Sequence, residues 1–191
     1  MACGVCYNRV PVVVVVREGL GLSGPPGLHA AAATCAPIVA VYVLDEDRPG
    51  LKSPQPRPLG GAARWWLAQS LRALDSDLRK RGAQLLLRNG AAVEVIGAIA
   101  RETSATAVYW NDIAQAPHRA ITKQLATSLN EIGVAAEISN GDLLVPRAAI
   151  PNKDGHCLRV STPFWQRNLA AGGPPNPPPP HSPPPAYGAP P

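Results

Sequence analysis

Three glycines near the N-terminus match a phosphate-binding pattern. Gly19, Gly21 and Gly24 fit G-x-G-x-x-G and follow a run of valines that predicts a strand over 12–16. Asp45 stands 21 residues after the last glycine, at the end of the next predicted strand. A dinucleotide-binding fold places its ribose-binding carboxylate at that point. The spacing therefore predicts one candidate function, the binding of a nucleotide cofactor.

Two prolines directly after the glycines favour a different interpretation. Pro25 and Pro26 have no N–H group to donate, and they hold the chain extended, so we expect the first helix only over 28–34. A pyrophosphate needs free N–H groups at a helix N-terminus close to the glycines. The prolines thus favour a glycine-rich loop without a ligand, and the nucleotide-binding module remains as the alternative.

Cys3 and Cys6 form a C-x-x-C pair, which is typical of redox and zinc sites. The pair precedes the first predicted strand, whereas a thioredoxin-type pair opens a helix after a strand. Further zinc ligands would have to come from unrelated loops that hold Cys35, His156 and Cys157. We therefore predict no metal site and no disulfide scaffold.

Polar residues also follow the predicted strands, where ligands of α/β proteins bind. Arg17, Asp45, Arg88, Asn111 and His118 all stand at such ends. The sequence holds no G-x-S-x-G elbow, P-loop or H-E-x-x-H motif that would pair a nucleophile or a metal with its base. These residues are candidates for a binding crevice, but for any one of them a solvated loop residue is the commoner explanation. We predict no catalytic residues.

Six of the nine aromatic residues lie in three adjacent pairs, Trp65-Trp66, Tyr109-Trp110 and Phe164-Trp165. Neighbours on a helix point about 100° apart, so Trp65 and Trp66 cannot both face one sheet. Packing in the core and at its edge explains most such pairs. The alternative is that one tryptophan covers a chromophore or a second domain.

The elements that position these residues alternate between strand and helix. Apolar, β-branched runs predict five strands, at 12–16, 38–44, 83–87, 106–110 and 134–138. Leucine and isoleucine stripes of helical period predict helices between them, and a last short helix is expected over 163–171. This order predicts an α/β fold, a three-layer Rossmann-like architecture with a five-stranded parallel sheet and helices on both faces.

Composition divides the chain into three parts. Of the 23 prolines, eleven fall in 174–191, so we expect a flexible N-terminus at 1–11, a domain at 12–171 and a proline-rich linker or tail at 172–191. The longest apolar run, 10–16, is too short to cross a bilayer or to form a signal sequence. The expected location is the cytoplasm. A net charge of +5 is no strong signal for nucleic-acid binding.

Several longer segments resemble the DNA photolyase and cryptochrome family. GGAARWWLAQSLRALDSDLRKRG at 60–82 resembles the first long helix of that family, and VYVLDE at 41–46 and VYWN at 108–111 resemble two of its strands. NGDLLVP at 140–146 and RVSTPFW at 159–165 resemble the loop that leads to its catalytic domain. The resemblance runs from about Val13 to Trp165, nearly the whole predicted domain.

The resemblance implies an N-terminal light-harvesting lobe of a deoxyribodipyrimidine photolyase-like protein. In this family the lobe holds an antenna pigment, a deazaflavin or a folate, while FAD and damaged DNA bind a separate helical domain that is expected to be absent from this chain. Such a chain would be inactive alone in the light-driven repair of pyrimidine dimers. The alternatives are the nucleotide- or pigment-binding module above, a cryptochrome-type photoreceptor fragment, or a non-functional gene fragment.

The resemblance also divides the candidate residues into two groups. The sequence departs from the family pattern in places. The family segment W-F-R-x-D-L-R corresponds to 15–21 and keeps only Arg17 and Leu20, and an Asn-Glu pair that holds folate in some members falls at Pro117-His118. The candidates for the antenna or ligand crevice are Arg17, Asp45, Glu46, Trp110, Asn111 and His118. The candidates for contact with a second domain are Trp65, Trp66, Arg159, Thr162, Phe164 and Trp165.

Overall fold

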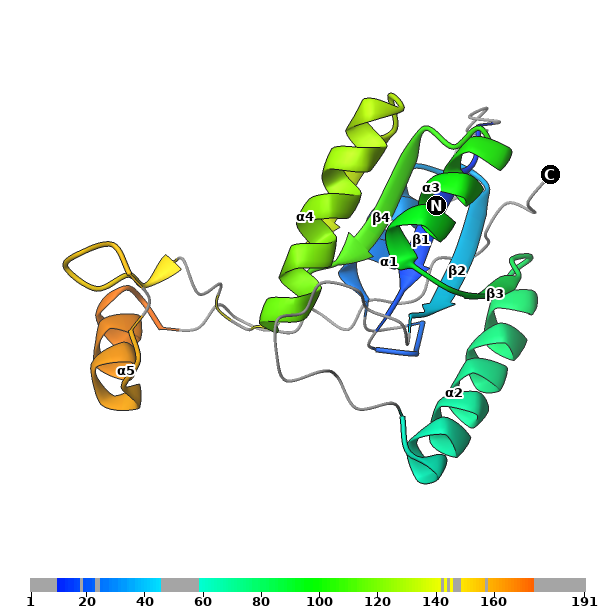
Figure 1. Cartoon of the computed structure of the whole chain (residues 1–191). Coiled ribbons are helices and arrows are strands. Elements are labelled where there is room, and N and C mark those ends of the chain that lie inside the picture. Colours follow the sequence, from blue (N-terminus) through cyan, green and yellow to red (C-terminus); the bar gives the residue numbers. More distant parts are fainter. Residues whose placement is uncertain are drawn as a thin grey trace, which may run out of the picture.

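The computed structural model describes residues 10–17, 19–22, 25–45, 59–141, 143, 145, 149–156 and 158–173. Five strands and five helices alternate along these residues (Figure 1). Their order is β1 (Val12–Val16), α1 (Pro26–Ala33), β2 (Ile38–Leu44), α2 (Gly61–Arg79), β3 (Leu85–Asn89), α3 (Ala92–Glu102), β4 (Ala107–Asn111), α4 (Ala116–Glu131), β5 (Ala135–Ser139) and α5 (Ser161–Ala170). The expected α/β alternation is confirmed.

The five strands form one parallel sheet in the order β3-β2-β1-β4-β5. β1 lies in the middle, and Val12 is paired with Ile38 on one side and with Ala107 on the other. All five valines of β1 are buried, because helices cover the sheet on both faces. The chain leaves β1 toward β2 and β3, and later returns to add β4 and β5 on the opposite side, so the strand order reverses between β1 and β4.

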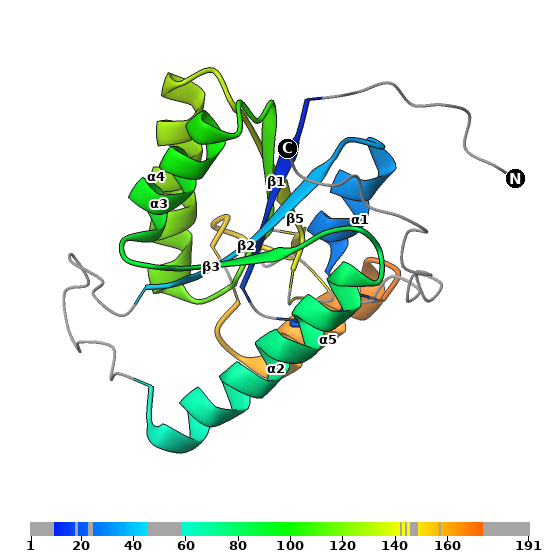
Figure 2. The same ribbon diagram turned by 90° about the vertical axis from the view of Figure 1, so that its right-hand side faces the viewer.

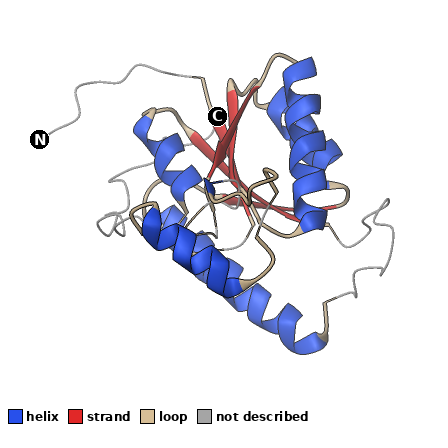
Figure 3. Ribbon diagram, turned by 90° about the vertical axis from the view of Figure 1, so that its left-hand side faces the viewer, coloured by secondary structure: helices blue, strands red, loops and turns tan. Residues whose placement is uncertain are grey.

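The helices make two layers around this sheet. Val12, Val14 and Val16 face the layer that holds α1 and α2, whose buried leucines include Leu28 and Leu74. The alternate residues of β1 face the layer of α3 and α4. Figures 2 and 3 show the two layers with the sheet between them. The predicted three-layer architecture is therefore confirmed.

Three strands begin later than predicted, by two residues in β3 and by one in β4 and β5. In β3 and β5 the first predicted residue, Ala83 or Val134, closes the preceding helix instead of joining the sheet. In β4 the residue before the predicted start, Ala105, closes the helix in the same way. The N–H of Ala83 donates to the carbonyl of Leu78, that of Ala105 to Ala100 and that of Val134 to Leu129. These bonds are typical of helix C-terminal caps.

The first and last helices also differ from the prediction. α1 begins at Pro26 instead of residue 28, because a proline at the first helical position lacks only an N–H that would have no partner within the helix. α5 spans Ser161–Ala170 instead of 163–171 and stands apart from the sheet, beyond α4 in Figure 1. No helix in the described ranges is long and apolar enough to span a membrane.

Candidate functional site

The carboxyl end of the sheet, where the strand order reverses, is occupied by the start of α1. The N–H of Gly27 donates to Oδ1 of Asn111, at the end of β4, over 2.9 Å. A Cβ at residue 27 would lie 3.0 Å from that oxygen and 3.3 Å from the carbonyl carbon of Trp110. Only glycine lets α1 approach β4 this closely. Asn111 thus joins a helix to a strand instead of projecting into an open crevice.

This arrangement removes the nucleotide-binding loop that the glycine spacing suggested. Pro25 and Pro26 have no N–H, Gly27 donates to Asn111, and the N–H groups of Leu28 and His29 donate to the carbonyl of Pro25. Ser23 and Gly24 lie outside the described residues. As expected from the sequence, the helix begins only after the last glycine, although two residues earlier than the expected start at 28. The described amides at the start of α1 are also already engaged, so they offer a phosphate no free donor.

Asp45 binds a helix start as well. Its Oδ2 accepts a hydrogen bond from the N–H of Ala92, the first residue of α3, over 3.2 Å. A carboxylate at this position satisfies a donor that the helix leaves without an internal partner and interacts favourably with the helix dipole. The position after β2 therefore serves the fold, and Glu46 beside it lies outside the described residues.

Two further crevice candidates, Trp110 and His118, lie under or on α4. Trp110 is only 1% exposed and packs in the core on the side of α3 and α4, so its inclusion among the ligand residues was wrong. A buried aromatic ring between the sheet and the layer of α3 and α4 cannot reach a ligand at the surface. His118 is half-buried in the first turn of α4.

A shallow pocket of about 500 Å³ opens between the loop after β1 and the first half of α2. We call it the β1–α2 pocket. Its volume falls in the range of sites for small molecules. Its lining combines one cation, one large aromatic ring and small or apolar residues, and comprises Arg17, Gly19, Leu20, Ala63, Trp66, Leu67 and Ser70.

Arg17 and Trp66 give this pocket its chemical character. Arg17 is half-buried at the end of β1, and its Nη1 lies 3.5 Å from the hydroxyl of Thr122. Trp66 is 68% exposed, and the centroid of its ring lies 6.4 Å from that of Trp65. Both residues line one pocket, in which an exposed indole suits a flat aromatic molecule and a cation suits one that carries negative charge or acceptor oxygens.

The pocket unites residues for which the sequence predicts different roles. Arg17 is a ligand candidate, and Trp66 is a candidate for contact with another domain. The signal that could have joined them is the resemblance of 15–21 and 60–82 to two segments of one family. Without tertiary structure, nothing in their spacing places the loop after β1 beside the start of α2.

The remaining candidates lie on two separate exposed surfaces. Trp65, which is 61% exposed, and Trp66 form the α2 aromatic surface at the end of the helix that extends past the sheet (Figure 2). Val160, Trp165 and Leu169 form the α5 apolar surface, and each is more than half exposed. Arg159 and Thr162 beside them are exposed too, and Phe164 is half-buried. Figure 1 shows α2 and α5 well apart, so these are two surfaces and not one.

Comparison with known proteins identifies the family. The family model of DNA photolyase matches residues 12–184, which include every strand and helix of the structure. The chain belongs to the DNA photolyase family. It is 35% identical over 159 residues to the deoxyribodipyrimidine photo-lyase of Agrobacterium fabrum, a match that covers 83% of this chain and 32% of that protein. Cryptochrome-1 of Arabidopsis thaliana is 28% identical over 159 residues, 22% of its length.

Solved structures agree with this assignment. A bacterial class III photolyase from Agrobacterium tumefaciens superimposes with a TM-score of 0.77 at 32% identity, over 100% of this chain and 37% of that one. The cryptochrome of Synechocystis gives 0.79 at 23% identity over 95% of this chain, which supports the fold alone. The chain thus spans about a third of the photo-lyases that it matches, and it corresponds to their N-terminal α/β region.

Proposed function

We propose that the α/β domain is the light-harvesting lobe of a photolyase-family protein and that the β1–α2 pocket holds its antenna pigment. One observation carries this proposal: Arg17 and the exposed ring of Trp66 line the same pocket at the carboxyl end of the sheet. Ligands of open α/β sheets bind at that end. The positions usual for a dinucleotide are engaged in the fold, because Asp45 binds α3 and the amides of α1 have partners.

An antenna needs no catalytic residue. Passing excitation energy to a second chromophore makes and breaks no bond, so the protein has only to bind the pigment and fix its orientation. Trp66 would contact the face of the ring system, and Leu20 and Leu67 would contact its edge. The guanidinium of Arg17 would bind an acceptor oxygen.

The pigment that fits best is a deazaflavin or a flavin. Both have a flat three-ring system that can stack on an indole. The Asn-Glu pair that holds folate in some members of the family is replaced here by Pro117 and His118, so folate is the weaker candidate. The crystal structure of the photolyase of Sulfolobus tokodaii holds two FAD molecules and implies a novel light-harvesting cofactor. FAD is therefore a further candidate for the pigment.

Titration of the purified chain with a deazaflavin, FAD, a folate and NAD tests this function. We expect saturable binding of the deazaflavin or FAD, followed by absorption and by quenching of tryptophan fluorescence, and no binding of NAD. Binding of NAD that Asp45→Ala abolishes would instead support the nucleotide-binding module. Because Asp45→Ala also removes a helix partner, the fold of that variant is checked by circular dichroism.

We propose further that the α2 aromatic surface and the α5 apolar surface contact the FAD-binding helical region of the family. Large apolar side chains that are more than half exposed are unusual when they gather on one helix and are typical of contact surfaces. Damaged DNA and the FAD that repairs it would bind that region, so the polypeptide of residues 1–191 would not split a pyrimidine dimer by itself.

An apolar dye and light scattering test these surfaces. We expect the purified chain to bind a dye such as anilinonaphthalene sulfonate and to associate at high concentration. Trp165→Ser together with Leu169→Ser is expected to lower both signals. Replacement of two exposed polar residues of α2, Gln69→Ser and Arg72→Ser, is the control. A monomeric chain that binds no dye would contradict the proposed contact surfaces.

A further inference from the structure

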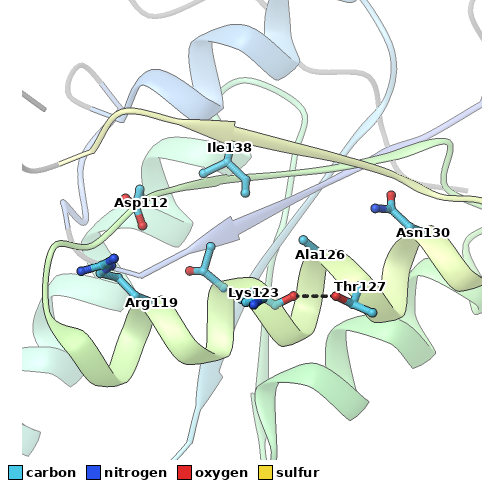
Figure 4. A pocket seen from close by; sticks show the side chains of 8 residues that line it. Asp112, Arg119, Lys123, Ala126, Thr127, Asn130 and Ile138 are labelled. Carbon is cyan, nitrogen blue, oxygen red and sulfur yellow. Dashed lines mark hydrogen bonds between the residues drawn. The ribbon is translucent and has the colours of Figure 1, made fainter. Parts of the chain in front are cut away.

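A second pocket of about 430 Å³ lies on the opposite layer, between α4 and the edge strand β5. We call it the α4–β5 groove. Asp112 and Arg119 lie at one end of it and Asn130 at the other, with Ile138 over the middle (Figure 4). Its other lining residues are Thr122, Lys123, Ala126 and Thr127.

The groove exists because α4 covers only part of β5. Ile138 is the partner of Trp110 in the neighbouring strand and shares its face of the sheet, yet it is 46% exposed whereas Trp110 is buried. The residue of α4 in this part of the groove is the small Ala126, which leaves the isoleucine uncovered (Figure 4). Together these two residues make an apolar wall with open space beside it.

The charged groups of the groove have no partners among the residues that the structure describes. Arg119 and Lys123 lie one helical turn apart on α4, so their side chains project to the same side. Within the described ranges, neither side chain makes a hydrogen bond or an ion pair, and the same holds for the carboxylate of Asp112. On α2, by contrast, Arg79 is paired with Asp75 over 2.8 Å and Lys80 with Asp77 over 2.7 Å.

We propose that the α4–β5 groove binds a nucleoside monophosphate, at a site distinct from the β1–α2 pocket. The phosphate lies over Arg119 and Lys123, which donate charge-assisted hydrogen bonds to it. The base packs on the apolar wall of Ile138 and Ala126. The amide of Asn130, at the far end, supplies both a donor and an acceptor to the edge of the base.

Asp112 limits the number of phosphates. Its carboxylate lies beside Arg119 at the end of the groove, where a second and a third phosphate would extend (Figure 4). With the guanidinium of Arg17, which lies 3.5 Å from the lining residue Thr122, three cations and one carboxylate give the groove and its edge a formal charge of about +2. This charge suits that of a single phosphate, roughly −1.5 to −2 at neutral pH. The groove therefore prefers a monophosphate to a triphosphate, although the triphosphate carries more negative charge.

Isothermal titration calorimetry of the full chain at low salt, with AMP, ATP and ribose 5-phosphate, tests the site. We expect AMP to bind more tightly than either of the others. Arg119→Ala with Lys123→Ala is expected to weaken AMP binding by about tenfold or more. Asp112→Asn is expected to raise the affinity for ATP relative to AMP.

Arg72→Ala is the matched control, because Arg72 is an exposed cation on α2, far from the groove in the fold. It should leave AMP binding unchanged. The proposal fails if AMP does not saturate the chain at millimolar concentration, if ATP binds more tightly than AMP to the unaltered chain, or if the control lowers the affinity as much as the double variant. Circular dichroism confirms that each variant is folded.

Discussion

Replacing Asn111 with alanine should destabilise the fold, because the side chain holds α1 to the sheet. The residue accepts the hydrogen bond of the Gly27 N–H over 2.9 Å, and Gly27 is buried. Without the acceptor, that N–H loses its partner in a place that water reaches poorly, which costs about 1–3 kcal/mol. For a domain of this size each kcal/mol lowers Tm by about 2–4 °C. The expected fall in Tm is thus about 2–12 °C.

Urea unfolding followed by circular dichroism measures the loss in free energy of unfolding. Two further variants show whether the hydrogen bond of Asn111 causes it. Asn89 ends β3 as Asn111 ends β4, but its side chain is exposed, so Asn89→Ala should change the free energy of unfolding by less than about 0.5 kcal/mol. Asn111→Asp keeps an acceptor oxygen and should retain most of the stability. Equal losses in Asn111→Ala and Asn89→Ala would refute the structural role of Asn111.

Two other substitutions test the packing of the helices. The Arg79 guanidinium donates a hydrogen bond to Asp75 and holds the pKa of this carboxyl below its ordinary value of 3.8. The pair therefore stabilises the fold above about pH 4, and this contribution is lost as the pH falls through the lowered pKa. Asp75→Ala should therefore lower the free energy of unfolding at pH 7 by about 1 kcal/mol and by less at pH 3, and a difference independent of pH would contradict this. Gly27→Ala should lower the free energy of unfolding by about 1–3 kcal/mol, because the new Cβ meets β4. Gly97→Ala on α3 is the control: its Cβ meets no atom within 4 Å, so it should not destabilise the fold. If urea unfolding ranks the two variants the other way, α1 does not approach β4 this closely.

The fold could be predicted from the sequence because strands that are buried on both faces of the sheet consist of apolar residues alone. The five valines of β1 have no polar residue among them, and Leu71, Leu74 and Leu78 follow the period of a helix. The residues at which the strands begin were harder to predict. Whether Ala83 pairs with a strand or closes a helix depends on a hydrogen bond to Leu78, which apolar periodicity does not encode.

The candidate site was less predictable, since it depends on which ends of distant segments meet. Asp45 and Asn111 stand where ligands often bind, but each has a backbone N–H of a neighbouring helix within reach. Trp110 stands one residue before Asn111, and the alternation of a strand turns it into the core. Arg17 and Trp66 are 49 positions apart in the sequence, and only the tertiary fold brings both to the β1–α2 pocket.

The binding of an antenna pigment in the β1–α2 pocket can be tested directly with a deazaflavin. The measurement compares its affinity for the unaltered chain and for Trp66→Ala. Equilibrium titration monitored by pigment absorption should give saturable binding to the unaltered chain and a dissociation constant about tenfold higher for Trp66→Ala, from the loss of ring stacking and buried area. Trp165→Ala, which removes a ring that is 52% exposed on α5 against 68% for Trp66, should bind like the unaltered chain. Absence of deazaflavin binding, or equal affinity of both variants for it, would contradict a pigment site in the β1–α2 pocket.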